Sequence, residues 1–365
     1  MIDRVLAVNA GSSSLKLRVL DAKDKQVGAR DLEASDEGFD EPSVRAAIEE
    51  LDSVDAVGHR VVHGGEVFSE SVRVDGDVVA KLRALIGLAP LHQPQSLAAL
   101  EIVSRALPGT PAVACFDTAF HDSLPAAAAT YALPEEWRVR FGLRRYGFHG
   151  LSHAYASRRA SELAGAPKDA VAIVTCHLGA GASLAAVKDG ASVDTTMGFT
   201  PLEGVVMATR SGTVDPGLVM WLIQQRGMPP AEVANGLERK SGLVGLAGSA
   251  DMRDVLAAAE RGDDRSRLAV NVYVHRLRKA IAEMVAAMGA IDLLVFTGGI
   301  GENAPEIRRR AVEGLRFLGV ALDREANRRA HGDAEIGAGD EKVRVFVVRS
   351  REELEMVKEV RRVLA

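Results

Sequence analysis

The feature of this chain that most constrains its fold is a pattern that occurs twice. Each copy has an apolar strand, a turn rich in Gly, Ala and Ser, a second strand, and a short polar turn that leads to another extended stretch. The first copy comprises residues 5–8, 9–14, 15–20 and 21–24, and the second comprises residues 171–175, 177–183, 184–187, 188–190 and 191–194. Two copies of one strand pattern predict an internal duplication, and therefore two halves built on similar sheets.

Helical segments lie between and after these copies. Apolar residues recur with helical spacing in residues 43–51, 78–88, 96–107, 152–163 and 266–288, and a last helix is predicted at residues 352–364. We predict a buried strand at residues 293–296 and interpret the Ala-rich stretch 126–129 as a loop near a domain crossover. Strands that alternate with helices predict the α/β class, and a length of 365 residues suggests two domains.

The composition argues against two classes of partner. Charged residues make up 26% of the chain, and the net charge of −5 is spread without a block of like charge, which argues against nucleic-acid binding. No run of apolar residues is long enough to predict a membrane span, and the first residues lack the apolar core of a signal peptide. We therefore expect a cytoplasmic protein. Cys115 and Cys176 each follow an apolar run, so we expect buried thiols rather than a disulfide.

Three turns that contain glycine follow apolar strands, at residues 9–14, 179–183 and 298–303. Glycine lets the backbone approach a phosphate closely, and such turns can direct several N–H groups at one anion. Each turn alone could be an ordinary connection, but three in one chain favour phosphate binding. No G-x-x-x-x-G-K-[ST] string occurs, which excludes a P-loop enzyme. The second turn leads into a strand rather than a helix, which argues against a dinucleotide-binding fold.

Four polar residues stand in unusual local contexts. Arg60 interrupts an apolar run before a double glycine, Asp117 stands among aromatic residues, His149 lies between aromatic and glycine neighbours, and Arg210 precedes Ser-Gly. Burial of a charged group is costly unless it is paired or functional. Each residue alone could be part of a structural ion pair or a core histidine. Together they suggest chemistry on anions, since arginine offers a planar fork for carboxylate or phosphate oxygens.

Two pairs of histidines are spaced four residues apart, His59 with His63 and His149 with His153. Such spacing can hold zinc on one helix face. No H-E-x-x-H string and no supporting cysteines accompany these pairs, so we do not expect metal ligation by these histidines.

The longer strings resemble one family. Residues 9–16 (Asn-Ala-Gly-Ser-Ser-Ser-Leu-Lys) resemble the opening motif of the acetate kinases, which belong to the acetate and sugar kinase/heat-shock 70/actin superfamily. Successive blocks that resemble the same family are residues 58–66, 89–92, 116–121, 146–153, 197–204, 209–212 and 298–303. The blocks occur in the family order, and the resemblance runs from residue 5 to about residue 356.

This resemblance implies an α/β fold of two domains with a duplicated ribonuclease H-like (actin-like ATPase) core and an active site in the cleft between the domains. The N-terminal acetokinase domain would comprise residues 1–121 plus 354–365, and the C-terminal nucleotide-binding and dimerisation domain residues 122–353. The implied partners are acetate or acetyl phosphate and ATP or ADP, with Mg²⁺ as cofactor and Mn²⁺ as an alternative ion. The resemblance also suggests a homodimer formed through the second domain.

The resemblance carries residue roles with it. Asp117, His149, Arg210 and Arg60 would be catalytic. Arg60 would also bind the substrate, and the residues implied for the small apolar pocket are Val62, Leu91, Phe148 and Pro201. The residues implied for ATP are Ser12, Ser14, Lys16, His177, Leu178, Gly179, Ala180, Gly181, Asp251, Met252, Arg253, Gly299, Ile300, Gly301, Glu302 and Asn303. Asn9 and Glu352 would support Mg²⁺, partly through water.

The chemistry is consistent with these roles, because a carboxylate is already ionised at neutral pH and needs no general base. The reaction instead requires that the repulsion between the carboxylate and the phosphate be cancelled and that the two groups be held in line. It also requires stabilisation of the charge on the equatorial phosphoryl oxygens. We therefore expect direct phosphoryl transfer from ATP to acetate, giving acetyl phosphate and ADP. One alternative is a propionate or butyrate kinase on the same fold. Another is an actin-like ATPase that is not a kinase, which would have little use for two arginines and a histidine around a second small ligand.

The chain departs from the family pattern at several positions. Ala180 occupies a position where the family usually has Asn, and Gln93 also replaces a usual Asn. Ser350-Arg351 precedes two adjacent glutamates, Glu352 and Glu353, where Thr-Asn is usual, so either glutamate could be the magnesium residue. The segment between Lys16 and Arg60 is also shorter than usual.

Overall fold

The structure is a computed structural model, and it describes residues 2–11, 14–34, 38–90, 92–167, 170–339 and 341–365. The chain divides into two compact units. Unit 1 comprises residues 1–122, 148–155 and 351–365, and unit 2 comprises residues 123–147 and 156–350. These units are defined by compactness, and they group residues 148–155 with the first part of the chain. The predicted domain limits and the predicted cleft stay predictions.

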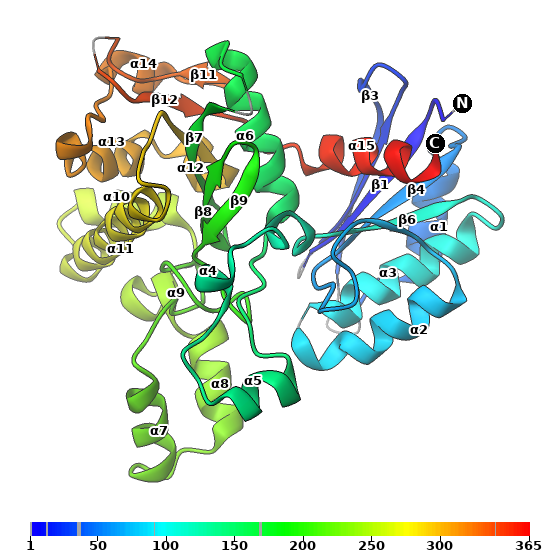
Figure 1. The fold of residues 1–365 in the computed structure, drawn as a ribbon, viewed down its shortest axis with the longest axis horizontal. Coiled ribbons are helices and arrows are strands. Elements are labelled where there is room, and N and C mark those ends of the chain that lie inside the picture. The colour runs from blue at the N-terminus through cyan, green and yellow to red at the C-terminus, as the bar shows by residue number, and fades with distance from the viewer. Residues whose placement is uncertain (1, 12–13, 35–37, 91, 168–169, 340) are drawn as a thin grey trace. The chain divides into compact units, whose positions relative to one another are not determined.

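Unit 1 contains one mixed sheet with helices on both faces (Figure 1). Its elements are β1 (Val5–Ala10), β2 (Ser14–Leu20), β3 (Gln26–Glu33), α1 (Glu41–Glu49), β4 (Ala56–Val61), β5 (Val72–Arg73), α2 (Gly76–Ala84), α3 (Gln93–Ala106), β6 (Ala112–Phe116), the start of α6 (Gly150–Ala164) and α15 (Glu352–Leu364). In the described residues the strand order is β3-β2-β1-β4-β6-β5. Strands β1, β4 and β6 run parallel, and β2, β3 and β5 are antiparallel to their neighbours.

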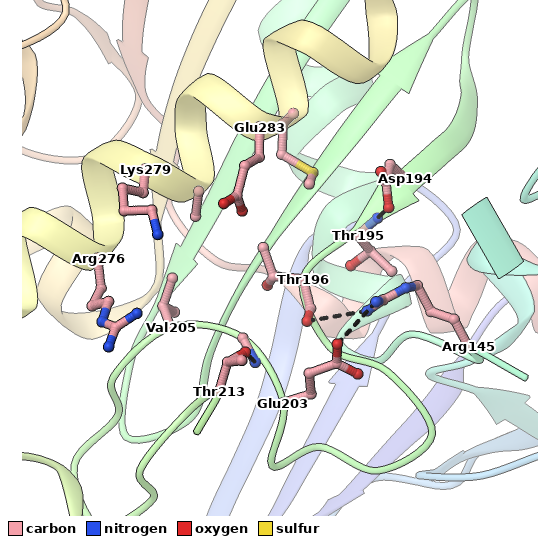
Figure 2. A pocket seen from close by; sticks show the side chains of 13 residues that line it. Arg145, Asp194, Thr195, Thr196, Glu203, Val205, Thr213, Arg276, Lys279 and Glu283 are labelled. Carbon is pink, nitrogen blue, oxygen red and sulfur yellow. Dashed lines mark hydrogen bonds and ion pairs between the residues drawn. The ribbon is translucent and has the colours of Figure 1, made fainter. Parts of the chain in front are cut away.

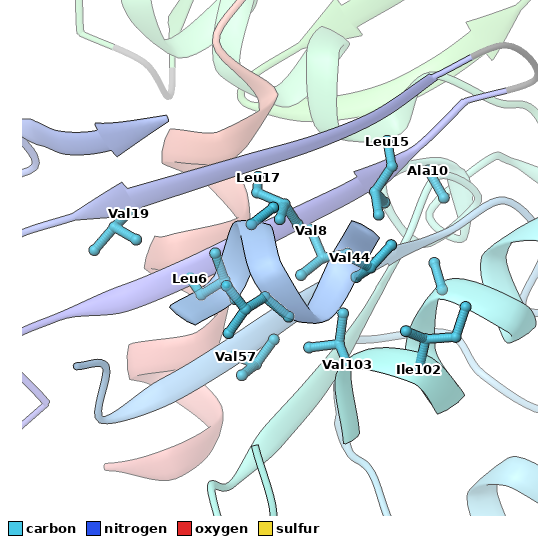
Figure 3. Close-up of a cluster of buried hydrophobic side chains, with 13 residues drawn as sticks. Leu6, Val8, Ala10, Leu15, Leu17, Val19, Val44, Val57, Ile102 and Val103 are labelled. Atoms are coloured by element: carbon cyan, nitrogen blue, oxygen red, sulfur yellow. The ribbon is translucent and has the colours of Figure 1, made fainter. Parts of the chain in front are cut away.

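The alternation of side chains along β1 explains why both faces of this sheet are covered. Leu6 and Val8 point to one face, where they pack with Val44 of α1 and Val103 of α3 (Figure 3). Val5 and Ala7 of β1 point to the opposite face, where α15 packs. A strand turns successive side chains to opposite faces, so an unbroken apolar run is the pattern of a strand buried on both sides.

Unit 2 repeats the same sheet. Its elements are α4 (Ala126–Ala129), α5 (Glu135–Phe141), the rest of α6, β7 (Ala172–Leu178), β8 (Ala182–Lys188), β9 (Ala191–Thr195), α7 (Pro216–Gln224), α8 (Pro230–Arg239), α9 (Gly242–Ala247), α10 (Met252–Glu260), α11 (Asp264–Met288), β10 (Leu293–Thr297), α12 (Gly298–Asn303), α13 (Pro305–Glu313), α14 (Arg324–Arg329), β11 (Ala334–Glu335) and β12 (Arg344–Val347). The described strands have the order β11-β12-β10-β7-β8-β9.

The two sheets have one topology. In each, three antiparallel strands are followed by two strands parallel to the first, and a short antiparallel strand pairs with the last. The predicted α/β class and the duplicated core are therefore confirmed. The two cysteines are buried free thiols, as predicted, and burial raises the pKa of Cys115 to about 12.

Two local predictions were wrong. Residues 126–129, interpreted as a loop, form the short helix α4, because alanine has the highest helix propensity and Pro125 precedes the first turn. Residues 298–303, interpreted as a turn, form helix α12 directly after β10. Gly298 makes this abrupt change of direction at φ +77°, where a Cβ would lie 2.9 Å from the Leu178 carbonyl oxygen. Glycine tolerates that conformation and closeness without strain.

Candidate active site

The carboxyl ends of the parallel strands in unit 1 bring three predicted site residues together. Asn9 lies near the end of β1, Arg60 near the end of β4, and Asp117 directly after β6. The guanidinium of Arg60 donates to both carboxylate oxygens of Asp117, from Nε at 2.9 Å and from NH2 at 2.6 Å. Its NH1 donates to Oδ1 of Asn9 at 3.0 Å. Parallel strands collect their C-terminal residues at one sheet edge, so residues distant in sequence meet there.

Helix α15 adds the fourth residue of this cluster. Glu352 is its first residue, and Nδ2 of Asn9 donates to Oε2 of Glu352 at 2.8 Å. The same oxygen lies 3.8 Å from Nε of Arg60. Glu353 has no such contact with Asn9 or Arg60 among the described residues. The pKa of its carboxyl group is raised, mainly because the group is buried. The geometry therefore supports Glu352 rather than Glu353 as the carboxylate of this cluster.

Two carboxylates and one guanidinium meet in this cluster. The side chains of Arg60, Asp117 and Glu352 are 15%, 2% and 12% exposed, so two carboxylates share one guanidinium away from bulk water. Burial alone would lower the pKa of Arg60, but the charges of both carboxylates raise it instead. Burial raises the pKa of Asp117, and the charge and hydrogen bonds of Arg60 oppose that rise. Two carboxylates at one edge of the sheet make this edge a suitable place for a cation.

His149 is held next to this cluster by its backbone. It adopts φ +56°, a left-handed conformation that is uncommon for residues other than glycine. The backbone N–H of His149 donates to the Asp117 carboxylate, and that of Gly150 donates to the Asp117 carbonyl oxygen at 2.9 Å. Strained backbone of this kind concentrates at functional sites. These bonds tie His149 to the segment that carries Asp117.

The predicted apolar pocket is represented in unit 1 by Val62 and Phe148, both buried. The ring of Phe148 meets the ring of His63 edge-on, with centroids 5.3 Å apart. Oε1 of Gln93 accepts from the backbone N–H of His63 at 3.2 Å, and Nε2 of Gln93 donates to the His63 carbonyl at 3.1 Å. Leu91 and Ser12 lie outside the described residues. The contribution of Pro201, which belongs to unit 2, stays a prediction.

Unit 2 contains a cavity of about 490 Å³ that is lined mainly by predicted ATP residues. The predicted residues in its wall are Gly179, Ala180, Asp251, Met252, Arg253, Gly299, Ile300 and Asn303. They come from the turn after β7, the start of α10 and helix α12. A volume of this size falls in the range of small-molecule sites. The carboxylate of Asp251 accepts from Arg253 Nε and NH2, so this pair forms one charged edge of the cavity.

Several predicted ATP residues do not line this cavity. Among the described residues, Ser14 and Lys16 belong to unit 1, whereas His177, Leu178, Gly181, Gly301 and Glu302 lie in unit 2 outside the cavity wall. Glu302 instead accepts from the backbone N–H of Ser350 at 2.9 Å. Sequence reasoning missed the apolar wall residues Ala250, Leu256 and Ala304. Ala250 and Ala304 are adjacent in sequence to predicted residues, and Leu256 follows Met252 by one helical turn. This proximity in sequence could have identified them as wall residues.

Arg210 lies in unit 2 on a loop that folds back on itself. Its NH1 donates to the Pro201 carbonyl oxygen at 2.9 Å, and its own carbonyl accepts from the Met207 N–H at 3.2 Å. The base of the loop is closed between Gly204 and Thr213 by two hydrogen bonds. Arg210 and Pro201, which were both predicted as site residues, are therefore brought together by a direct contact.

No group of three His, Cys, Asp or Glu side chains in the described part of the chain is arranged to hold a metal ion by itself. None of the helices in that part has the length and apolar character needed to cross a bilayer.

The duplicated ribonuclease H-like core places this chain in the actin-like ATPase fold class. A model described as the Acetokinase family matches residues 33–358. The acetate kinase of Thermoanaerobacterium thermosaccharolyticum is 41% identical, covering 99% of both chains. The crystal structure of Porphyromonas gingivalis acetate kinase matches with a TM-score of 0.90 at 36% identity, covering 100% of both chains. The crystal structure of a propionate kinase from Francisella tularensis also matches with a TM-score of 0.90, at 34% identity and covering 99% of both chains.

This chain belongs to the acetokinase family, whose members transfer a phosphoryl group to a carboxyl group and use ATP and ADP. The predicted family is confirmed.

Proposed function

We propose that this enzyme is an acetate kinase, which catalyses reversible transfer of the γ-phosphoryl group of ATP to acetate. The observation that carries this proposal is the cluster around Arg60 in a chain of this family. In the forward direction an acetate oxygen bonds to the γ-phosphorus while the bond from that phosphorus to the β,γ-bridging oxygen breaks. The products are acetyl phosphate and ADP. Acetate is already ionised at neutral pH, so no group has to remove a proton from it.

The proposed roles follow from the charges. Arg60 and Arg210 cancel the repulsion between the carboxylate and the phosphoryl oxygens, because arginine stays protonated and presents a planar set of donors. Asp117 holds Arg60 in one orientation through two hydrogen bonds. His149 donates to the phosphoryl oxygens in the transition state. The cavity lined by Gly179, Asp251 and Gly299 takes the nucleotide.

The residues of unit 1 also suit Mg²⁺. Asn9, Asp117 and Glu352 offer hard oxygen ligands, and the carboxylates of Asp117 and Glu352 lie beside Arg60 with little exposure to solvent. Mg²⁺ commonly uses one or two protein carboxylates and takes its other ligands from water and substrate phosphates. This preference fits a site where the described side chains cannot enclose an ion alone. When bound, the ion would neutralise charge on the phosphates; Mn²⁺ is the alternative.

The test of this function is formation of an acyl phosphate from ATP, Mg²⁺ and acetate, trapped as a hydroxamate, with propionate and butyrate in parallel. We expect the rate to be highest with acetate and to fall as the acid lengthens. Because one methylene in an apolar pocket is worth only about 1–3 kcal/mol, some activity with propionate is expected. Activity confined to the longer acids would reassign the substrate. ATP hydrolysis that no carboxylic acid accelerates would point instead to an ATPase that is not a kinase.

The proposed transfer is direct, without a phosphoenzyme. Incubation of the enzyme with ATP and Mg²⁺ alone, followed by acid quenching and mass spectrometry, should show no phosphorylated Asp or Glu. Recovery of an acyl phosphate on either residue type, and its loss on addition of acetate, would overturn direct transfer while leaving the overall reaction in place.

The Ala180 position allows a test of the nucleotide cavity. We expect Ala180→Asn to lower the KM for ATP about tenfold, because a hydrogen bond to a charged group contributes about 1.5–3 kcal/mol. The KM for acetate should not change. Ala127→Asn, an exposed position on α4, is the control and should leave both constants unchanged. An unchanged KM for ATP in Ala180→Asn would mean that the phosphates do not pass this residue.

We also propose that the enzyme is a homodimer that associates through helix α7 of unit 2. This helix has no charged residue, yet Leu218 and Trp221 on one of its faces are 46% and 48% exposed. A second copy of the same apolar face would cover both side chains. We expect sedimentation to give a dimer for the wild type and a monomer for Trp221→Glu. Phe317→Glu, at another exposed aromatic residue, is the control. A dimer that survives Trp221→Glu would contradict this interface.

A further inference from the structure

The carboxylate of Glu203 is the centre of a hydrogen-bond network in unit 2. Its Oε2 accepts from the hydroxyl of Tyr131 at 2.5 Å, and its Oε1 accepts from NH2 of Arg145 at 2.9 Å. NH1 of Arg145 also donates to the Thr196 carbonyl oxygen at 3.3 Å, and Figure 2 shows both bonds of Arg145 at one wall of a cavity of about 400 Å³. The Tyr131 oxygen accepts in turn from the backbone N–H of Phe199 at 2.9 Å.

The segment from residue 197 to 204 is wrapped closely around this carboxylate. A Cβ at Gly198 would lie 1.7 Å from Oε2 of Glu203 and 2.0 Å from the Tyr131 oxygen, so only glycine fits there. The Gly198 carbonyl accepts from the backbone N–H groups of Tyr146 and Gly147 at 3.1 and 3.3 Å. The segment is therefore attached at Gly198 and at Phe199.

The same segment continues to the residue that orients Arg210. Pro201 lies between the attachment at Phe199 and the network centre at Glu203, and its carbonyl oxygen accepts from NH1 of Arg210 at 2.9 Å. Immediately after Glu203, Gly204 pairs with Thr213 and closes the loop that carries Arg210. A displacement of the Glu203 carboxylate would therefore move both the base of the loop and the acceptor for the guanidinium.

Tyr131 takes part in this network as a hydrogen-bond donor. Burial, followed by the hydrogen bond to Glu203, raises the pKa of Tyr131, so its phenol remains a donor. The guanidinium of Arg145 also lies 5.6 Å from the Tyr131 ring centroid. A phenol donor and a guanidinium hold one carboxylate from two sides.

We propose that Tyr131, Arg145 and Glu203 are positioning residues that hold Arg210 in the orientation needed for phosphoryl transfer. They act through the Pro201 carbonyl and the closed base of the loop, and they need not touch the substrate. This inference rests on the proposed function, since it presumes that Arg210 stabilises charge in the transition state. Because misplacement of a catalytic group by about 1 Å can cost about 100-fold in rate, a network distant from the chemistry can control kcat.

The first test is Tyr131→Phe, which removes only the hydroxyl. We expect kcat to fall about 10- to 100-fold while the KM for ATP stays within twofold, because none of these residues lines the nucleotide cavity. Tyr146→Phe is the matched control. It removes a phenol of the same region that donates to the Gly142 carbonyl at 3.0 Å, and we expect kcat within twofold of wild type. An equal fall in kcat in the two variants would show that removal of any phenol hydroxyl in this region lowers the rate. That result would overturn the proposal.

The second test asks whether Tyr131 acts through Arg210. In the Arg210→Ala background, adding Tyr131→Phe should change the remaining rate by less than twofold, because there is no guanidinium left to orient. A further 10- to 100-fold loss in the double variant would overturn the positioning role and leave the proposed function intact. Wild-type activity in Arg210→Ala itself would instead remove Arg210 from the proposed reaction.

Glu203→Gln is a second route if Tyr131→Phe lowers the melting temperature. The amide keeps the size of the side chain and can accept from Tyr131, but it loses the charge that attracts Arg145. We expect a fall in kcat that also disappears in the Arg210→Ala background. A fall that persists there would contradict the proposal independently of folding.

Discussion

Arg60→Ala is expected to lower kcat/KM for acetate by about 10³- to 10⁵-fold, the range that an arginine contributes to phosphoryl transfer. The guanidinium of Arg60 makes a two-point contact with Asp117 and also bonds Asn9, so its removal takes away a cation and the order it imposes on both partners. Steady-state kinetics with the hydroxamate assay measures this change. Arg60→Lys should recover only a small part of the rate, because an ammonium cannot bond both Asp117 oxygens in the same plane.

The same substitution should also reduce stability, and the two effects can be separated. Arg60→Ala leaves Asp117 buried without its partner, at a cost of about 3–5 kcal/mol. Adding Asp117→Asn removes the unpaired charge, so the double variant should regain much of the lost stability without regaining activity. Arg18→Ala, which breaks a more exposed ion pair with Asp31, is the control and should cost less than about 1 kcal/mol. Recovery of activity in the double variant would mean that Arg60 serves folding only.

Gly150→Ala is expected to lower kcat about 100-fold and to destabilise unit 1 by about 1–3 kcal/mol. A Cβ at Gly150 would lie 2.2 Å from the carbonyl oxygen of Asp117 and 2.9 Å from the Cβ of Phe120. Neither contact can be relieved by rotation of a flexible side chain, so the backbone that carries Asp117 or the preceding His149 has to move. Kinetic assays and denaturant unfolding of the same preparation measure the two effects.

Gly76→Ala is the matched control for this prediction. Gly76 is also the first residue of a helix in unit 1, but a Cβ there meets no atom within 4 Å. We expect wild-type kcat and a stability that is unchanged or higher by about 0.4–1 kcal/mol, because alanine restricts the unfolded chain more than glycine does. If Gly150→Ala also kept wild-type kcat, close packing of α6 against Asp117 would not be needed for catalysis.

Much of the fold could be predicted from short stretches of sequence. The apolar runs that became β1, β7 and β10, and the spacing that became α11 and α15, are local patterns with a period of two or of three to four residues. The duplication was visible because each copy repeats its strands and turns in one order. The predictions for residues 126–129 and 298–303 failed because short helices depend on their flanking residues and on packing more than on period.

The site could be predicted only in part. An arginine inside an apolar run and an aspartate among aromatic residues mark Arg60 and Asp117 as unusual, since an unpaired buried charge is costly. Most of the specific roles came from the resemblance of long strings to a family. The positioning role proposed for Tyr131 and Glu203 could not be predicted, because it depends on a hydrogen bond between residues 72 positions apart.

By itself the sequence determined the α/β class, the repeated strands, the turns that need glycine and the family. Only the tertiary structure decided which distant side chains meet. Asn9 and Glu352 are 343 positions apart, yet they share a hydrogen bond of 2.8 Å because α15 packs on the sheet that carries β1. Tyr131 and Glu203 are 72 positions apart and meet because Gly198 leaves room for both. Local periodicity sets which face of an element is apolar, whereas strand register and helix packing set its neighbours.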